Sequence, residues 1–225
     1  MVATNTDAAE VGYDPSTRTI LSNSHSRLDA HTDGARGFSD QYPDLLALLC
    51  AQQAASGGES FMVDGQYLCD AIARDPEQRH LARFLWGVPI EQCMPMGDTP
   101  PESPNYLRSR RPVASRTPGG RPTVRYHQHQ RALDDGPADD RDRAHLATWQ
   151  LLGQQAAAAA PRFLLRPGEL LSVDNYRVFH GREPYPGSER LLHRILAFTD
   201  MSFGGRNIGP AGGRRPGSNS ATVQP

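Results

Sequence analysis

The stretch Asp-Asn-Tyr-Arg-Val-Phe-His-Gly-Arg at residues 174–182 contains His180, a possible metal ligand. Two further possible ligands, His31 and Asp33, lie far upstream in the sequence His31-Thr32-Asp33. Side chains two residues apart on an extended segment point to the same side, so His31 and Asp33 can both reach one metal ion. His180 would lie on a strand distant in sequence that the folding of the sheet brings next to His31 and Asp33. Two histidines and one carboxylate are the protein ligands of a non-haem Fe(II) site, which leaves positions open for O2 and substrates.

The composition of the chain indicates one domain with an intracellular location. Its 225 residues are enough to bury a substantial core, and a formal net charge of −1 gives no indication of nucleic acid or anionic membranes as partners. The sequence lacks the run of about 20 apolar residues that a membrane span needs, and residues 1–10 are too polar for a signal peptide. Cys50, Cys69 and Cys93 lack CxxC spacing, which fits a reducing cytoplasm.

Turn residues divide the chain into short apolar segments, which predicts a mainly β protein of antiparallel strands with flanking α-helices. The apolar run at residues 43–55 favours a helix by composition, although a buried strand can have the same pattern. Asp64 is predicted to cap a helix that ends at Arg74, and Asp75-Pro76 to begin another. We expect strands at residues 18–24, 60–63, 163–165, 170–174 and 191–198, a helix at 139–160, and a long loop at 95–122.

Arg190 and Arg194 follow His180 at the place where a cosubstrate carboxylate would need a partner. 2-Oxoglutarate binds iron through its 2-keto oxygen and the adjacent carboxylate, which leaves the distal carboxylate for a fixed, charged side chain. Arginine is a bidentate and permanently charged partner, and all 24 basic residues of this chain are arginines. A solvated, self-paired turn at Ser188-Glu189-Arg190 is equally compatible with the spacing.

Four stretches of the chain occur in a characteristic order. They are His31-Thr32-Asp33, Gly57-Gly58-Glu59-Ser60, residues 174–182 and residues 190–194. Together they resemble the taurine/2-oxoglutarate dioxygenase superfamily of Fe(II)/2-oxoglutarate-dependent oxygenases, and most of all its γ-butyrobetaine and trimethyllysine hydroxylase-like branch. The resemblance reaches about Phe203, so residues 1–203 are expected to form one domain, followed by a disordered, Gly- and Pro-rich tail at 204–225.

The resemblance implies a double-stranded β-helix, or jelly roll, that binds Fe(II) through His31, Asp33 and His180. It also implies oxidative decarboxylation of 2-oxoglutarate to succinate and CO2, coupled to hydroxylation or a related C–H oxidation of a small substrate. Asp33 argues against the halogenating relatives, in which a small residue vacates this ligand position for halide.

The resemblance further implies a cosubstrate site. Ser60 matches a hydroxyl residue that hydrogen-bonds the 2-oxoglutarate carboxylate, and Arg190 matches the arginine that binds the cosubstrate. Arg194 matches a second arginine that helps to hold the cosubstrate or an anionic substrate. Two alternatives stay open: a non-catalytic or partner-completed jelly roll that binds a metal or ligand, and a cupin-type metalloenzyme without 2-oxoglutarate, in which Arg190 would have no function.

The substrate class is the least constrained part of the prediction. A quaternary ammonium substrate would need an aromatic cage. The candidates for such a cage are Phe38, Tyr42, Tyr67, Tyr106, Tyr126 and Tyr176. The candidates for binding an anionic group are Arg108, Arg125 and Arg194. We favour a small amino-acid-like or carboxylate-bearing substrate, and the sequence is compatible with a homo-oligomer.

Overall fold

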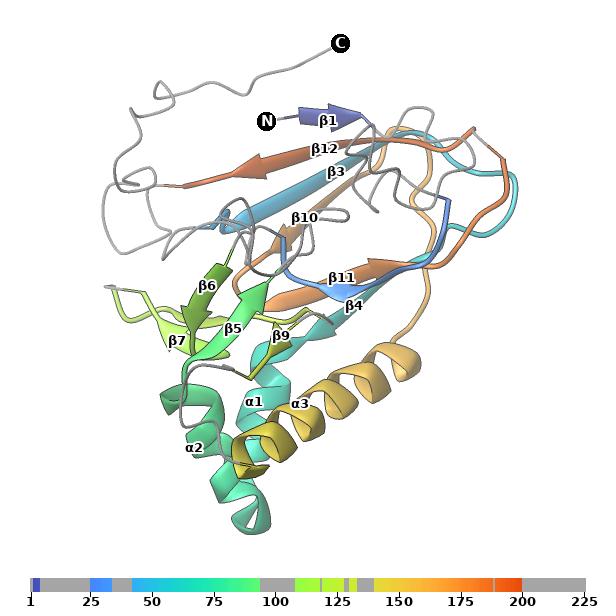
Figure 1. Cartoon of the computed structure of the whole chain (residues 1–225). Coiled ribbons are helices and arrows are strands. Elements are labelled where there is room, and N and C mark those ends of the chain that lie inside the picture. The colour runs from blue at the N-terminus through green and yellow to red at the C-terminus, as the bar shows by residue number, and fades with distance from the viewer. Residues whose placement is uncertain are drawn as a thin grey trace.

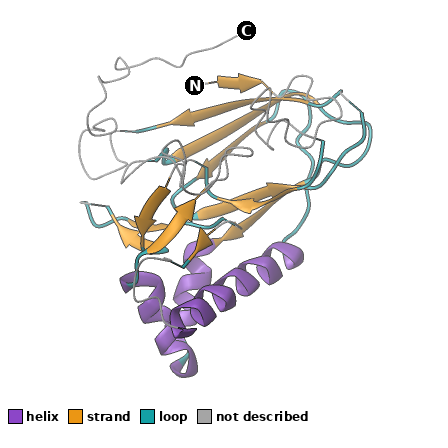
Figure 2. Ribbon diagram, viewed as in Figure 1, coloured by secondary structure: helices purple, strands orange, loops and turns teal. Residues whose placement is uncertain are grey.

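Strands make up most of the fold, and helices gather along one side of it (Figure 1, Figure 2). The computed structural model describes residues 2–4, 25–33, 42–93, 108–117, 119–127, 130–132, 140–187 and 189–199. The predicted mainly β class with flanking helices is confirmed over these ranges. The strand predicted at 18–24 and the tail predicted at 204–225 lie outside the described residues.

The larger sheet has four antiparallel strands in the order β1-β12-β3-β10. These strands are β1 (Val2–Thr4), β12 (Leu191–Ala197), β3 (Leu45–Gln52) and β10 (Leu170–Asp174). Strand β3 is central and pairs with β12 on one side and with β10 on the other. The predicted strands at 170–174 and 191–198 are therefore confirmed.

The helix favoured for residues 43–55 is wrong, because this apolar run forms β3. Cys50 packs in a buried cluster with Leu165 and Leu192, and strands on both sides take up the backbone hydrogen bonds of β3. Composition cannot separate a buried strand from a helix over so short a run. Pairing with β10 and β12, both more than a hundred positions downstream, decides the outcome.

The smaller sheet contains β2 (Leu28–His31), β11 (Val178–Arg182) and β4 (Ser60–Asp64), in the antiparallel order β2-β11-β4. In Figure 1 it lies between the larger sheet and the helices. The strand predicted at 60–63 is confirmed as β4. Residues 163–165 form no regular strand, and Phe163 makes only an isolated bridge to Ser60.

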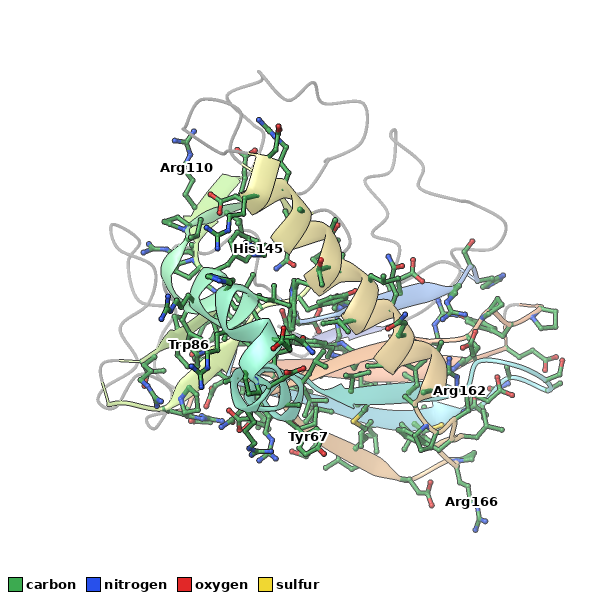
Figure 3. All side chains as sticks on the ribbon, turned by 90° about the horizontal axis from the view of Figure 1, so that it is seen from below. Tyr67, Trp86, Arg110, His145, Arg162 and Arg166 are labelled. Atoms are coloured by element: carbon green, nitrogen blue, oxygen red, sulfur yellow. The ribbon has the colours of Figure 1, made fainter. Side chains whose placement is uncertain are left out.

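Aromatic side chains join the smaller sheet to α3 (Asp140–Ala159), which confirms the helix predicted at 139–160. The rings of Tyr126 and Phe179 stack with centroids 4.7 Å apart, and Trp149 of α3 lies edge-on to both. Figure 3 shows α3 crossing the strands of this sheet. Because side chains alternate along a strand, Phe179 on the helix side places His180 on the side that faces the larger sheet.

Short strands occupy the end of the segment predicted to be a long loop, so that prediction is wrong from residue 108 onward. They are β6 (Arg108–Arg111), which pairs with β5 (Ile90–Cys93), and β7 (Ala114–Arg116), which pairs with β8 (Pro122–Val124). Strand β5 also pairs with β9 (Gln130–Arg131). These strands lack an apolar period because they are short and polar, so pairing rather than patterning defines them. Residues 94–107 lie outside the described part of the chain.

The predicted cap at Asp64 is confirmed. Its Oδ1 accepts a hydrogen bond from the Tyr67 N–H at 2.9 Å, at the start of α1 (Gly65–Arg74). Asp75 likewise begins a short 3-10 turn, η2 (Pro76–Gln78), which leads directly into α2 (Arg79–Gly87).

Replacing Asp64 by alanine is expected to lower the free energy of unfolding by about 1–2 kcal/mol, the usual cost of losing a cap. The variant also loses the ion pair with Arg177 at 2.6 Å. Burial raises the pKa of Asp64, but hydrogen bonds from Arg177 and Tyr67 outweigh it and lower that pKa. The stabilisation is therefore present at neutral pH and disappears as the pH falls through the lowered pKa. Urea unfolding of Asp64→Ala beside Asp70→Ala, on the same helix, measures the difference.

Candidate active site

Strand pairing brings His31, Asp33 and His180 together. His31 ends β2, and its Cα lies opposite that of His180 on β11, while Asp33 follows two residues later. One potential ligand atom from each of the three side chains lies within 4.8 Å of the others. All three residues are buried. The residues predicted from the sequence to be metal ligands thus form one cluster.

The two histidines direct nitrogen atoms at the Asp33 carboxylate. His31 Nε2 lies 3.5 Å from Asp33 Oδ1, and His180 Nε2 lies 3.6 Å from Asp33 Oδ2. His31 Nδ1 lies 2.8 Å from the carbonyl oxygen of Asp29. Because a carbonyl only accepts, Nδ1 carries the proton and the Nε2 lone pair of His31 is free to bind a metal. This contact could not be predicted from the sequence, because any residue can supply a backbone carbonyl.

The charge states of Asp33 and His180 suit the binding of a cation. Burial raises the pKa of the Asp33 carboxyl, but contacts with His180 and His31 and the charge of Arg194 outweigh it and hold this pKa well below its usual range. Burial, helped by the neighbouring His31, lowers the pKa of His180. An ionised carboxylate and neutral imidazoles are the forms that bind metals.

Asn175 holds the ligand segment in place from the turn after β10. Its Oδ1 accepts a hydrogen bond from the Asp33 N–H at 2.9 Å, and its Nδ2 donates to the carbonyl oxygens of Asp33 and Pro43. The residue is fully buried. Asn175 stands in the stretch 174–182 that identified His180, yet its positioning role was not predicted, since one asparagine in a motif does not reveal its partners.

Asn175→Ala is expected to destabilise the fold by about 3 kcal/mol or more, because each buried polar group left without a partner costs about 1–3 kcal/mol. The Asp33 N–H and two carbonyl groups lose their partner together. Thermal unfolding measures the loss, and Ser172→Ala, an exposed site on β10, is the control. A change in Tm no larger than that of the control would contradict this account of Asn175.

Arg194 joins the cluster from the larger sheet. Its Nη1 lies 3.5 Å from Asp33 Oδ1, and the residue stands on β12 opposite Leu48 of β3. The arginine thus links the two sheets at the point where the predicted ligands meet.

Arg190 lies just before β12 and is buried, with 3% of its surface exposed. Its Nε donates to Gln53 Oε1 at 3.0 Å, and the ion pairs of the described residues do not include Arg190. Burial, together with the nearby charge of Arg182, lowers the pKa of Arg190 to about 10. This arginine is not the self-paired surface turn that the spacing allowed.

Gly58 lies against Arg190, and Ser60 lies beside Arg182. Gly58 has φ +74°, and a Cβ there would lie 3.1 Å from Cδ and Nε of Arg190, so only glycine fits without displacing that side chain. Ser60 begins β4, is buried, and lies opposite Arg182 in the strand register. Ser60 is therefore beside Arg182, the arginine whose charge acts on Arg190.

The model of one protein family, described as "Taurine catabolism dioxygenase TauD, TfdA family", matches residues 1–196. The chain belongs to this TauD/TfdA family. It is 28% identical over 189 residues to trimethyllysine dioxygenase, mitochondrial, of Gallus gallus, a match that covers 81% of this chain and 43% of the relative. It is 35% identical over 100 residues to clavaminate synthase 2 of Streptomyces clavuligerus, which covers 43% of this chain and 27% of that protein.

Solved structures share the fold of this TauD/TfdA chain. An asparagine oxygenase in complex with Fe(II), 3-hydroxyasparagine and succinate superposes with a TM-score of 0.62 at 19% identity, over 88% of this chain and 56% of that one. The chain spans less than half the length of the trimethyllysine dioxygenases that it matches. Among the residues that the structure describes, no helix is both long and apolar enough to cross a membrane.

The aromatic residues predicted as candidates for a substrate cage differ in their exposure to solvent. Tyr67 is 65% exposed on α1, whereas Tyr42, Tyr126 and Tyr176 are buried. Phe38 and Tyr106 lie outside the described residues. The described tyrosines therefore give no evidence of an open cage.

Proposed function

We propose that the protein is an Fe(II)/2-oxoglutarate-dependent oxygenase, which couples oxidative decarboxylation of 2-oxoglutarate to hydroxylation of a small amino-acid-like or carboxylate-bearing substrate. The observation that carries the proposal is the buried cluster of His31, Asp33 and His180. We further propose that the two facing sheets are the halves of a double-stranded β-helix, or jelly roll, that residues 1–203 form one domain, and that the protein is cytoplasmic.

The cluster fits a divalent iron ion. Asp33 Oδ2 is buried without a hydrogen-bond partner among the described residues, as expected of an oxygen reserved for a cation. Two imidazole nitrogens and one carboxylate form the donor set of a non-haem Fe(II) oxygenase site. Fe(II), when bound there, supplies the oxidative chemistry with O2 and 2-oxoglutarate. The three side chains hold the ion, and their burial excludes water from the reacting groups.

Arg190 is the proposed partner of the distal carboxylate of 2-oxoglutarate. It is a buried guanidinium without an acidic partner in the described part of the chain, and the charge of Arg182 adds to its positive field. A dianionic cosubstrate would relieve the repulsion between the two arginines and satisfy the fork of Arg190. Ser60 would donate its hydroxyl to a cosubstrate carboxylate, and Arg194 would orient Asp33 or help to bind an anionic group.

Family membership supports this function, since mitochondrial trimethyllysine dioxygenases and clavaminate synthase 2 are relatives of the chain. The substrate that we favour is amino-acid-like, in keeping with the trimethyllysine of the first of these names.

An anaerobic titration tests the proposal. Fe(II) and 2-oxoglutarate are added to metal-free protein, and the weak visible absorption band of an Fe(II)–2-oxoacid chelate is recorded. The band is expected when both are present and not when either is left out. A correctly folded protein that gives no band would contradict the oxygenase assignment and favour a non-catalytic binding protein.

A further inference from the structure

Arg125 is a buried cation without an acidic partner among the described residues. The residue is 2% exposed, and its Nε and Nη1 atoms have no hydrogen-bond partner there. A buried polar group left unsatisfied is destabilising, and a charged one more so. The guanidinium carbon lies 4.8 Å from the ring of Tyr42, a contact that compensates the charge only in part. The buried guanidinium of Arg125 therefore has donors available to bind an anion.

Hydrogen bonds of the next residue, Tyr126, join the segment that contains Arg125 to the segment of the predicted metal ligands. The Thr32 N–H, between the two upstream ligands, donates to the carbonyl of Tyr126 at 3.0 Å, and the Tyr126 N–H donates to Thr32 Oγ1 at 3.2 Å. The side chain of Tyr126 packs on the helix side. That of His127 lies with its ring 6.1 Å from the ring of His31. Arg125 therefore stands directly before two residues that contact the ligand segment, Tyr126 at Thr32 and His127 at His31.

Tyr42 adds a second donor to this position. It is fully buried, and its hydroxyl makes no hydrogen bond of normal geometry among the described residues, although Thr123 and Arg125 lie close enough to lower its pKa. Burial raises the pKa of Tyr42, although the charge of Arg125 opposes the rise, so the hydroxyl stays protonated and able to donate. The next residue, Pro43, is held by Asn175, which also holds Asp33. The backbone next to Tyr42 is therefore joined through Asn175 to the segment that carries Asp33.

This pair is separate from the arginine assigned to the cosubstrate. Arg190 contacts Gln53 and the ring of Tyr185, whereas Arg125 lies over the ring of Tyr42. A protein that binds two carboxylate-bearing molecules at once needs two such cationic positions. Arg190 serves the cosubstrate in the proposed function, which leaves Arg125 for the other molecule.

We propose that Arg125, with the hydroxyl of Tyr42, binds the carboxylate of an amino-acid-like substrate and holds that substrate beside the metal site. The inference rests on the proposed function, because it assigns the anchor of the second organic molecule in that reaction. The planar fork of arginine meets both oxygens of a carboxylate, and such a bond satisfies the donors that the fold leaves unpaired.

The test uses the full chain loaded anaerobically with Fe(II) and N-oxalylglycine, which fills the cosubstrate position without turnover. Acetate is the carboxylate probe, and sodium chloride keeps the ionic strength constant. A ligand that binds the folded state raises Tm with its concentration. We expect acetate to raise the Tm of the wild type, and its apparent affinity to fall about tenfold or more in Arg125→Gln. An acetate response equal to that of the wild type in Arg125→Gln, or no response in the wild type, overturns the proposal.

The matched control is Arg166→Gln, which makes the same chemical change at an exposed arginine that points away from the body of the molecule in Figure 3. This variant is expected to respond to acetate as the wild type does. Arg125→Met is a second variant that keeps the stem packed on Tyr42 and removes the charge. Without acetate it is expected to be at least as stable as the wild type, because no described group pairs with that charge. A Tm several degrees lower would identify a structural cation and overturn the proposal.

The visible chelate band separates the two hypotheses. If the wild type gives no band with Fe(II) and 2-oxoglutarate, the proposed function fails and this inference fails with it. If the band forms in the wild type and in Arg125→Gln alike, while acetate binds both equally, only the assignment of Arg125 fails.

Discussion

His180→Ala is expected to lower Fe(II) affinity more than about a hundredfold and to abolish succinate formation, because loss of a group that merely supports a metal ligand already costs about 10–100-fold. The side chain supplies one of three proposed ligands, and its removal leaves the Asp33 carboxylate buried with fewer contacts. Equilibrium dialysis with Fe(II) under anaerobic conditions measures the affinity directly.

The control for this variant is His193→Ala, which removes a histidine from β12 of the larger sheet, outside the cluster. It is expected to bind Fe(II) as the wild type does. Retention of Fe(II) affinity by folded His180→Ala would show that the ion, if bound, has other ligands, and would count against the proposed site.

Arg190→Ala is expected to weaken the binding of 2-oxoglutarate by about a hundredfold or more while Fe(II) binding stays near that of the wild type. Hydrogen bonds to a charged group are each worth about 1.5–3 kcal/mol, and a bidentate carboxylate pair contains two of them. The Nε of Arg190 donates to Gln53, and the guanidinium lies against Gly58 and the ring of Tyr185, with no acidic side chain among its described partners. Titration of the chelate band with 2-oxoglutarate gives the affinity.

Arg116→Ala, an exposed arginine over the ring of Trp86, is the matched control and should leave that titration unchanged. If Arg190→Ala loses neither cosubstrate affinity nor turnover, the cosubstrate role of Arg190 is wrong, and a metalloenzyme that does not use 2-oxoglutarate would account better for the site.

Local chemistry made part of the fold predictable. Asp64 was identified as a helix cap because a short acceptor side chain before a helix has one dominant use, and the structure confirms it. The run at residues 43–55 was not predictable in the same way. Its leucines suit a helix and a buried strand equally, and only pairing with β10 and β12 settles which forms. Contacts made far along the chain leave no local signal.

In the candidate site, too, the residue types could be predicted from the sequence, whereas the contacts between distant segments could not. Chemistry that needs a particular residue type, such as the His31, Asp33 and His180 set, could be predicted from sequence, and the structure brings these residues together. The supporting contacts could not be predicted. The carbonyl of Asp29 that orients His31 is backbone, and the bonds of Asn175 depend on a turn meeting a loop.

The bonds between Asp33 and Asn175 join positions 142 residues apart in the sequence. Contacts of such high sequence separation pay a large loop-closure entropy, so they tend to form late, after local helices and hairpins. The ion-binding constellation should therefore be absent from early folding intermediates and appear only with the native topology. Iron would then bind only the folded protein, so the free energy of unfolding would rise with the concentration of free Fe(II).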